Sequence, residues 1–174
     1  MLKAPVPPDE DDRLAALHAL LILDTPPEER FDRIVAFMAA EFDVPVALIT
    51  LVDRDRVWFK SRIGLAACDA ARDTSFCGHA IVVPELFVVP DMLQDSRFAD
   101  HPMVIGEPGL RMYAGAPLLL RSGHVAGMLC MNDTRVRDFD DLDYAILFSL
   151  RDLVVAELEG GPVAEAVEPH REQI

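Results

Sequence analysis

Arg72-Asp73-Thr74-Ser75-Phe76-Cys77-Gly78-His79-Ala80-Ile81 is the stretch that the rest of the predicted fold must position. It carries a thiol, an imidazole, a pair of hydroxyls and an aromatic ring beside a predicted helix start. Thr74 or Ser75 can cap that helix, because a side-chain oxygen accepts from the free amides of the first turn. Cys77 and His79 then lie in the first turn, where the helix dipole favours negative charge and eases ionisation of a thiol. We therefore expect a ligand, a covalent attachment or a redox reaction here.

The composition indicates one globular domain with an acidic surface. The chain has 174 residues, of which 51% are apolar, which is enough to fill a sizeable core. Sixteen basic and thirty acidic residues give a formal net charge of -14. The summed field repels phosphate groups, so neither nucleic acid nor an anionic membrane is expected as a partner.

The cysteines and the N-terminus predict a reducing compartment. Cys68, Cys77 and Cys130 form no paired framework, and residues 1–10 contain no apolar signal region. Charged residues interrupt every apolar run before it reaches membrane-spanning length. We expect a cytoplasmic protein with free thiols.

The N-terminal part of the chain predicts two helices. Residues 1–11 are rich in proline and acids, and we expect them to be mobile. Leucines at helical spacing predict a short helix over about residues 12–23. For the next helix, Thr25 fits the N-cap, Pro26 the first helical position and Glu28 the returning partner of a capping box. Its apolar face comprises Phe31, Ile34, Val35, Met38 and Phe42.

Two hairpins are predicted. The apolar run over 46–52 is typical of a strand buried on both sides, and 57–62 follows it across a polar turn. The second hairpin pairs 111–120 with 124–133. Between the hairpins the sequence predicts a loop over 64–73, the helix of the opening stretch up to about 83, a strand over 87–89, helical turns over 94–100 and irregular backbone over 101–109.

A long helix is expected over 139–158, with aspartates at its N-terminus, followed by a disordered tail over 160–174. Leu142, Ile146, Leu150 and Leu153 form one apolar stripe, and further apolar residues nearly complete the circumference. Such a helix must bury more than one face, so we expect a homodimer through the terminal helices. The order of elements favours an α+β fold, with helices packed on a central antiparallel sheet.

Six short motifs follow one another along the chain: Ser75-Phe76-Cys77-Gly78-His79-Ala80-Ile81, Phe87-Val88-Val89-Pro90-Asp91, Asp95-Ser96-Arg97-Phe98, Arg111-Met112-Tyr113-Ala114-Gly115-Ala116-Pro117-Leu118, Gly127-Met128-Leu129-Cys130 and Asn132-Asp133. They are preceded by Leu21-Ile22-Leu23-Asp24-Thr25-Pro26-Pro27 and Glu29-Arg30-Phe31-Asp32. The set resembles the GAF domain, in particular the bacterial subgroup found beside histidine kinase and cyclic-di-GMP output domains. The resemblance covers about residues 10–158.

The resemblance implies a GAF-like antiparallel sheet of five or six strands, with terminal helices on one face and short helices and loops over a ligand pocket on the other. GAF domains bind small molecules such as cyclic nucleotides, tetrapyrroles, haem or amino acids, and pass a change to an attached domain. This is an analogy of fold until a site supports it. We therefore assign residues 12–159 to a single GAF-type domain and expect a sensor of an unidentified small molecule in bacterial signal transduction.

Two features depart from the family pattern. The sequence shows no kinase, cyclase or DNA-binding segment after residue 158, so, if it is the whole protein, we expect the output to pass through a signalling partner in trans. No cyclic-nucleotide signature of the phosphodiesterase type can be carried over residue by residue. The cofactor is unknown.

Cys77-Gly78-His79 has three interpretations. It is a capped helix start with a buried thiol, or a pocket lining, or a site of bilin attachment or redox chemistry through Cys77. Cys130 is expected inside a strand and Cys68 in another loop, so the sequence indicates no pair of attacking and resolving thiols. His79, His101 and His124 lack the spacing of metal ligands.

Other side chains are candidates for the pocket. Asp91 and Arg97 either meet a ligand or tie down a loop by a salt bridge, and Arg111 can recognise a carboxylate or phosphate. Phe76, Phe98, Tyr113 and Met128 either line an apolar cavity or fill it. The predicted ligand-binding set is Phe76, Cys77, His79, Asp91, Arg97, Phe98, Arg111, Tyr113, Met128 and Cys130. We expect no catalytic and no metal-binding residue. The alternatives are a thiol-based redox sensor or a covalent chromophore-binding domain through Cys77, and a structural dimerisation module with a filled pocket.

Overall fold

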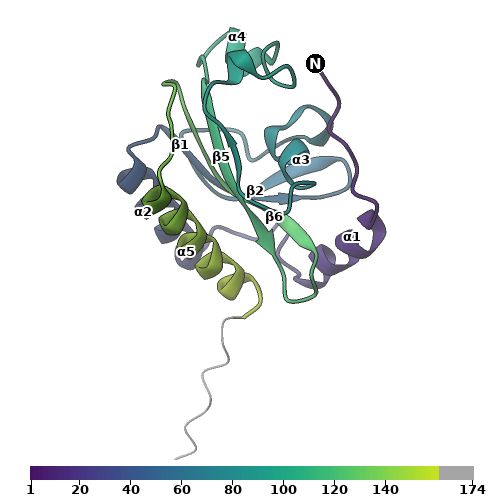
Figure 1. The fold of residues 1–174 in the computed structure, drawn as a ribbon. Helices are drawn as coiled ribbons and strands as arrows, with labels where there is room; N and C mark the ends of the chain where they lie inside the picture. Colours follow the sequence, from purple (N-terminus) through teal and green to yellow (C-terminus); the bar gives the residue numbers. More distant parts are fainter. Residues whose placement is uncertain (161–174) are drawn as a thin grey trace, which may run out of the picture.

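The fold is built on one antiparallel sheet. The computed structural model describes residues 1–160. Within them the strands are β1 (Val46–Val52), β2 (Arg56–Ile63), β3 (Asp69–Ala71), β4 (Phe87–Val89), β5 (Met112–Leu119) and β6 (Val125–Asp133) (Figure 1). They form a six-stranded sheet in the order β3-β2-β1-β6-β5-β4, and every neighbouring pair is antiparallel. The predicted α+β class and antiparallel sheet are confirmed.

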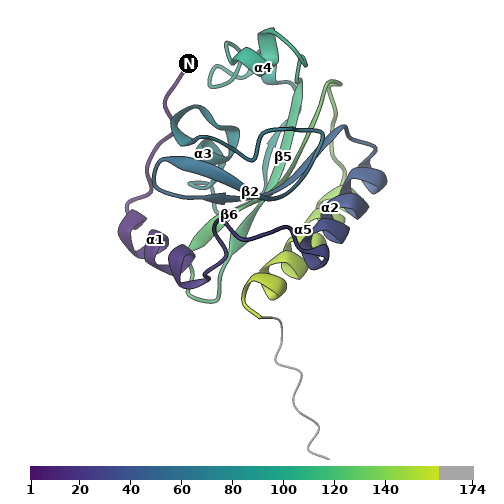
Figure 2. The ribbon, with the colours of Figure 1, turned by 180° about the vertical axis from the view of Figure 1, so that it is seen from behind.

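Helices cover both faces of this sheet. Those in residues 1–160 are α1 (Glu10–Ala19), α2 (Glu29–Phe42), α3 (Phe76–Ala80), α4 (Pro102–Ile105) and α5 (Asp141–Leu158), with single 3₁₀ turns η1 (Arg72–Thr74) and η2 (Met92–Gln94). The long helices α2 and α5 lie side by side on one face, and α3 lies on the other (Figures 1 and 2). The cavity described below lies on the α3 side.

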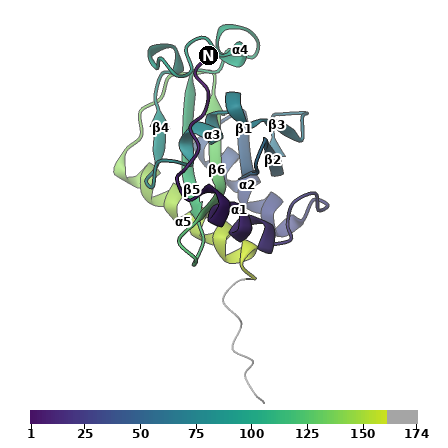
Figure 3. The same cartoon turned by 90° about the vertical axis from the view of Figure 1, so that its right-hand side faces the viewer.

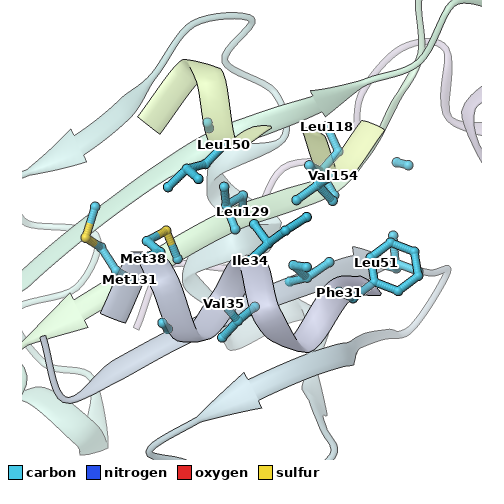
Figure 4. Packing of buried hydrophobic residues seen from close by; sticks show 14 of the residues in the cluster. Phe31, Ile34, Val35, Met38, Leu51, Leu118, Leu129, Met131, Leu150 and Val154 are labelled. Carbon is cyan, nitrogen blue, oxygen red and sulfur yellow. The ribbon is translucent and has the colours of Figure 1, made fainter. Parts of the chain in front are cut away.

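Alternating strand side chains divide the interior into two cores. Leu129 and Met131 of β6 face α2 and α5, where they pack with Ile34, Val35, Met38, Leu150 and Val154 (Figure 4). Met128 and Cys130 of the same strand face the α3 side. All seven residues of β1 are buried, which confirms a strand covered on both faces.

The first two helices begin and end at different residues from those predicted. α1 ends at Ala19, and the backbone turns away at Leu21, whose φ is 52°. α2 begins only at Glu29, because the Thr25 hydroxyl is already used: it donates to the Ile22 carbonyl oxygen at 2.5 Å and accepts from Lys60. The prediction of Thr25 as N-cap was therefore wrong.

Lys60 holds the connection between α1 and α2 against the sheet. Its side chain is fully buried, and Nζ donates to Thr25 Oγ1 at 2.8 Å and to the Pro26 carbonyl oxygen at 2.7 Å. A carboxylate oxygen of Glu28 lies 2.7 Å from the same nitrogen. All three ammonium hydrogens have an acceptor, which offsets the cost of burying the charge.

Two elements were missed by the sequence patterns. The predicted loop over 64–73 contains β3, an edge strand that pairs with β2 through Arg56–Ala71 and Trp58–Asp69. Residues 101–109 were expected to be irregular, but Pro102 begins α4 with His101 as its N-cap. The last helix follows its prediction closely, beginning at Asp141 with a capping box between Asp140 and Asp143.

The N-terminal segment runs across α3 (Figure 3). The Ala4 N–H donates to the Asp73 carbonyl oxygen at 2.9 Å, and the Leu2 carbonyl oxygen accepts from His79 Nε2 at 3.1 Å. Ala4 is 5% exposed. These contacts give the segment over 1–11 a defined place, and its mobility stays a prediction. The tail predicted over 160–174 lies outside the described residues apart from Gly160.

Candidate ligand-binding site

A cavity of about 190 Å³ lies between the sheet and the elements on its α3 side. Strands β1, β2, β5 and β6 form one wall, and α3 and the chain around α4 form the other. Its apolar surface comes mainly from Leu48, Val57, Phe59, Leu65, Met103 and Leu110. The polar groups at its wall come from Thr74, Ser75, His101, Tyr113 and Asn132 and from the thiols of Cys77 and Cys130, and none of the lining residues carries a carboxylate, an ammonium or a guanidinium.

Ser75 fixes the position of α3. Its hydroxyl oxygen accepts from the Gly78 N–H at 2.9 Å and donates to the Arg72 carbonyl oxygen at 2.9 Å. The predicted cap is therefore confirmed at Ser75 rather than Thr74. A Cβ atom at Gly78 would lie 2.5 Å from the Arg72 carbonyl oxygen, so only glycine lets the turn approach the helix this closely.

Phe76 organises the aromatic part of the wall. Its ring meets Phe98 edge-on at 5.3 Å between centroids, and it lies 5.9 Å from Tyr113. The His101 ring lies 4.5 Å from it on the side of α4. Phe76 and Tyr113 line the cavity, as does Cys77 next in the chain.

The cavity wall brings two thiols together. Cys77 Sγ lies 3.7 Å from Cys130 Sγ and 3.3 Å from Tyr113 Oη. Cys77 comes from α3 and Cys130 from the middle of β6, a separation of fifty-three positions in the chain. The sequence indicated no pair of attacking and resolving thiols, but the structure places Cys77 and Cys130 side by side, whereas Cys68 is exposed and lies in the connection between β2 and β3.

The surroundings of the two thiols make them unequal. A hydrogen bond from Cys130 lowers the pKa of Cys77; burial opposes this shift, and hydrogen bonds from Thr50 and Tyr113 add to it. The same hydrogen bond and burial raise the pKa of Cys130. Burial also raises the pKa of Tyr113, which keeps its phenol protonated as a donor. Cys77 is therefore the thiol that loses its proton first.

His101 is held in one neutral tautomer. Its Nδ1 accepts from the Met103 N–H at 3.1 Å, so Nε2 carries the hydrogen and donates to the Thr74 carbonyl oxygen at 3.1 Å. Burial lowers the pKa of His101. Its ring thus lines the cavity as a neutral group whose nitrogens are both engaged.

His79 does not line the cavity, although it lies on the same helix as Cys77. Its Nε2 donates to Leu2, and its ring meets Phe98 edge-on at 5.1 Å. Burial lowers the pKa of His79. The imidazole therefore joins the N-terminal segment to α3.

The predicted charged residues lie away from the cavity lining. Arg111 donates from Nε and Nη2 to both carboxylate oxygens of Asp91, each at 2.9 Å. Arg97 forms the corresponding pair with Asp95, and its guanidinium lies over the ring of Phe87. The hydrogen bond from Arg111 lowers the pKa of Asp91. These pairs hold the chain around η2.

The remaining predicted residues, Phe98 and Met128, are buried in the core beside the cavity but do not line it. Of the predicted set, the structure brings Phe76, Cys77, Tyr113 and Cys130 to the cavity. Sequence reasoning missed the aliphatic wall and His101. The alternation of side chains in β2 could have predicted that Val57 and Phe59 face the cavity together, because they share one face of that strand.

This arrangement suits a compact, uncharged ligand. An apolar wall with few polar groups rewards burial of apolar surface, and it offers no counter-charge to an ionised ligand. Within residues 1–160 no three His, Cys, Asp or Glu side chains come together as a possible metal site. None of the helices in the same range is long and apolar enough to cross a membrane.

An antiparallel sheet with two long helices on one face and a covered cavity on the other defines an α+β class of domain. The chain belongs to the GAF domain family, whose model matches residues 26–158. Over 159 residues it is 39% identical to a cyclic di-GMP phosphodiesterase of Pseudomonas aeruginosa. The match covers 91% of this chain but only 27% of that protein, so the chain spans about a quarter of its relative.

Solved structures share the fold at low sequence identity. The GAF domain of an Acinetobacter phosphoenolpyruvate-protein phosphotransferase is 17% identical, with a TM-score of 0.62 over 86% of this chain and 94% of that one. A free methionine-R-sulfoxide reductase from Neisseria meningitidis, solved with its substrate, is 19% identical with a TM-score of 0.62 over 86% and 87%. The fold is thus found both as a domain of a phosphotransferase and in a methionine sulfoxide reductase.

Proposed function

We propose that this GAF domain is a bacterial signalling sensor that binds a small, uncharged and mainly apolar molecule non-covalently in the cavity beside α3. The observation that carries the proposal is the cavity of about 190 Å³ with its apolar wall. An apolar cavity of ~150 Å³ in another protein takes up benzene, so this volume suits a ligand of roughly one or two rings. A tetrapyrrole or a cyclic dinucleotide is too large for it.

The domain acts by binding rather than by catalysis in this proposal. The lining carries no carboxylate and no cationic side chain for acid–base chemistry, and the one imidazole has both nitrogens engaged. The similarity to a cyclic di-GMP phosphodiesterase supports a place in cyclic-di-GMP signalling, with the output passed to a signalling protein.

We also propose a homodimer through the outer face of α2 and α5. Phe37 of α2 is 53% exposed, and Leu142 and Leu153 of α5 are 66% and 54% exposed. These large apolar side chains lie on two helices that pack against each other, so they provide a common surface for a second copy.

The cavity is tested by a ligand screen with a blocking variant. Purified protein is heated with a panel of neutral one- and two-ring compounds, and a ligand should raise the melting temperature by a few degrees. Leu65→Trp fills the cavity from its loop and should abolish that shift, whereas Leu119→Trp, at an exposed site on β5, should retain it.

Native mass spectrometry provides the second readout. A retained ligand appears as extra mass in the native spectrum that is lost on denaturation. If no compound shifts the melting temperature and no extra mass is found, the sensor proposal fails, and the structural dimerisation module takes its place.

A further inference from the structure

We propose that Cys77 and Cys130 are a peroxide-oxidisable dithiol in the cavity wall, in which Cys77 attacks a hydroperoxide and Cys130 resolves the product as an intramolecular disulfide. This modification site goes beyond the proposed ligand sensor and does not depend on it.

The distance between the sulfurs carries the inference. They lie 3.7 Å apart, and a disulfide bond is ~2 Å long, so closure requires an approach of less than ~2 Å. Cys130 lies on a strand that pairs with β1 on one side and β5 on the other. Cys77 lies on α3, a helix of five residues, so the adjustment falls on α3.

The cavity supplies access to both sulfurs. Cys77 is 5% exposed and Cys130 is fully buried, yet both line the cavity. Hydrogen peroxide is only slightly larger than water, and a space of 190 Å³ holds several molecules of that size. A bulky alkylating reagent is a poorer fit, which makes the site selective for small hydroperoxides.

The polar groups around the pair assign its two roles. Tyr113 Oη lies 3.3 Å from Cys77 Sγ and can donate to a thiolate there. The pKa of Cys77 is lowered by its hydrogen bonds while that of Cys130 is raised, so the attacking and resolving thiols are distinguished by their environment. Cys130 keeps its proton until Cys77 has reacted.

The reaction balances with a hydroperoxide as the named oxidant. The Cys77 thiolate attacks the peroxide, an S–O bond forms as the O–O bond breaks, and hydroxide leaves and takes up the proton that Cys77 released. Cys130 then attacks the sulfenic sulfur, an S–S bond forms as the S–O bond breaks, and the departing hydroxide takes the Cys130 proton as water. In total, two thiols and one hydrogen peroxide give one disulfide and two waters. A dithiol reductant reverses the change by exchange.

The test uses the full chain with Cys68→Ser, which removes the exposed thiol and leaves the pair intact. The folded protein is treated with one equivalent of hydrogen peroxide, denatured in a thiol-blocking reagent, and digested. We expect a disulfide-linked Cys77–Cys130 peptide, and the peptides in which Cys77 or Cys130 carries the blocking reagent should disappear. Treatment with dithiothreitol before blocking should restore both of these peptides in full.

Single variants separate the two roles. In the Cys68→Ser background, Cys130→Ala should accumulate a sulfenic acid at Cys77 that dimedone traps, whereas Cys77→Ala should leave Cys130 reduced at the same dose. Circular dichroism melting shows whether each variant is folded. If one is not, the linked peptide in the Cys68→Ser protein decides the question.

The proposal is overturned if both thiols survive a dose that oxidises Cys68 in the unmodified protein. It is equally overturned if Cys77 proceeds to sulfinic acid while Cys130 stays free. Neither result touches the ligand screen, which reads melting temperature under reducing conditions, so failure of the dithiol and failure of the sensor are distinguishable.

Discussion

At the scale of single residues, Glu10 is the charged group that holds two buried arginine side chains in place. Its carboxylate pairs with two nearly buried guanidinium groups, those of Arg13 and Arg72. Arg13 Nη1 also reaches the Val125 carbonyl oxygen at 3.2 Å, and Arg72 Nη1 reaches that of Asp53 at 3.0 Å. The network thus joins α1 to β6 and to the turn that precedes α3.

Glu10→Gln should destabilise the fold by about 1–3 kcal/mol at neutral pH, because it removes the negative charge that two buried guanidinium groups share. Burial raises the pKa of Glu10, but hydrogen bonds from Arg13 and Arg72 outweigh it and lower the pKa to about 2. A lowered carboxyl pKa contributes stability above the unfolded value of 4.5. The difference between variant and wild type should therefore shrink as the pH falls from 4.5 toward 2.

Urea unfolding at a series of pH values measures this difference. Asp11→Asn, on the same helix turn but with an exposed side chain, is the matched control and should change stability little at any pH. A constant gap between Glu10→Gln and wild type down to pH 2 would contradict the assigned role.

Single residues also show where sequence reasoning stops. Helical and strand periodicity assigned Phe76, Cys77 and Cys130 to a helix and a strand. The distance between the two sulfur atoms, however, depends on how β6 pairs with β1 and β5. His101 looked like a loop residue because the pattern around Pro102 reports backbone restriction, whereas its role comes from a long-range hydrogen bond to Thr74. The burial of Lys60 could not be predicted, since nothing local indicates that Thr25 would be its partner.

At the scale of elements, the hairpins and long helices were predictable because their signals are local. Alternation, apolar runs and turn residues mark β1 with β2 and β5 with β6, and the aspartates mark the start of α5. β3 was not predictable: its three residues are exposed, so burial leaves no pattern in them. The start of α2 was missed because the Thr25 hydroxyl is bonded to the Ile22 carbonyl oxygen and to Lys60 of β2, and the second partner is distant in sequence.

Removal of residues 1–4 should loosen α3, because it exposes the face that Ala4 covers and leaves His79 Nε2 without its acceptor. Each of the two hydrogen bonds that are lost contributes about 0.5–1.5 kcal/mol. Hydrogen exchange of a peptide over 75–83 should become at least tenfold faster, while a peptide from α5 should exchange as before. Equal protection of α3 in both proteins would show that the segment is only a loosely attached extension.

At the scale of the whole molecule, the proposed homodimer can be disrupted without touching the cavity. Leu153→Glu places a charge on the exposed face of α5 and should convert a dimer into a monomer in light scattering, with no loss of helical signal. Leu21→Glu, at a site that is 84% exposed on the α1–α2 connection, should leave the mass unchanged. A monomeric wild type over a wide concentration range would rule the dimer out.

β6 is shared by both cores: Leu129 and Met131 pack under the long helices, while Met128 and Cys130 face the cavity side. A movement of this strand perpendicular to the sheet enlarges the volume on one face and reduces the volume on the other. The free energy of filling the cavity is therefore coupled, through the position of β6, to the packing under α2 and α5. Substitutions at Leu129, which never meets the cavity, should for that reason alter how tightly the cavity holds its occupant.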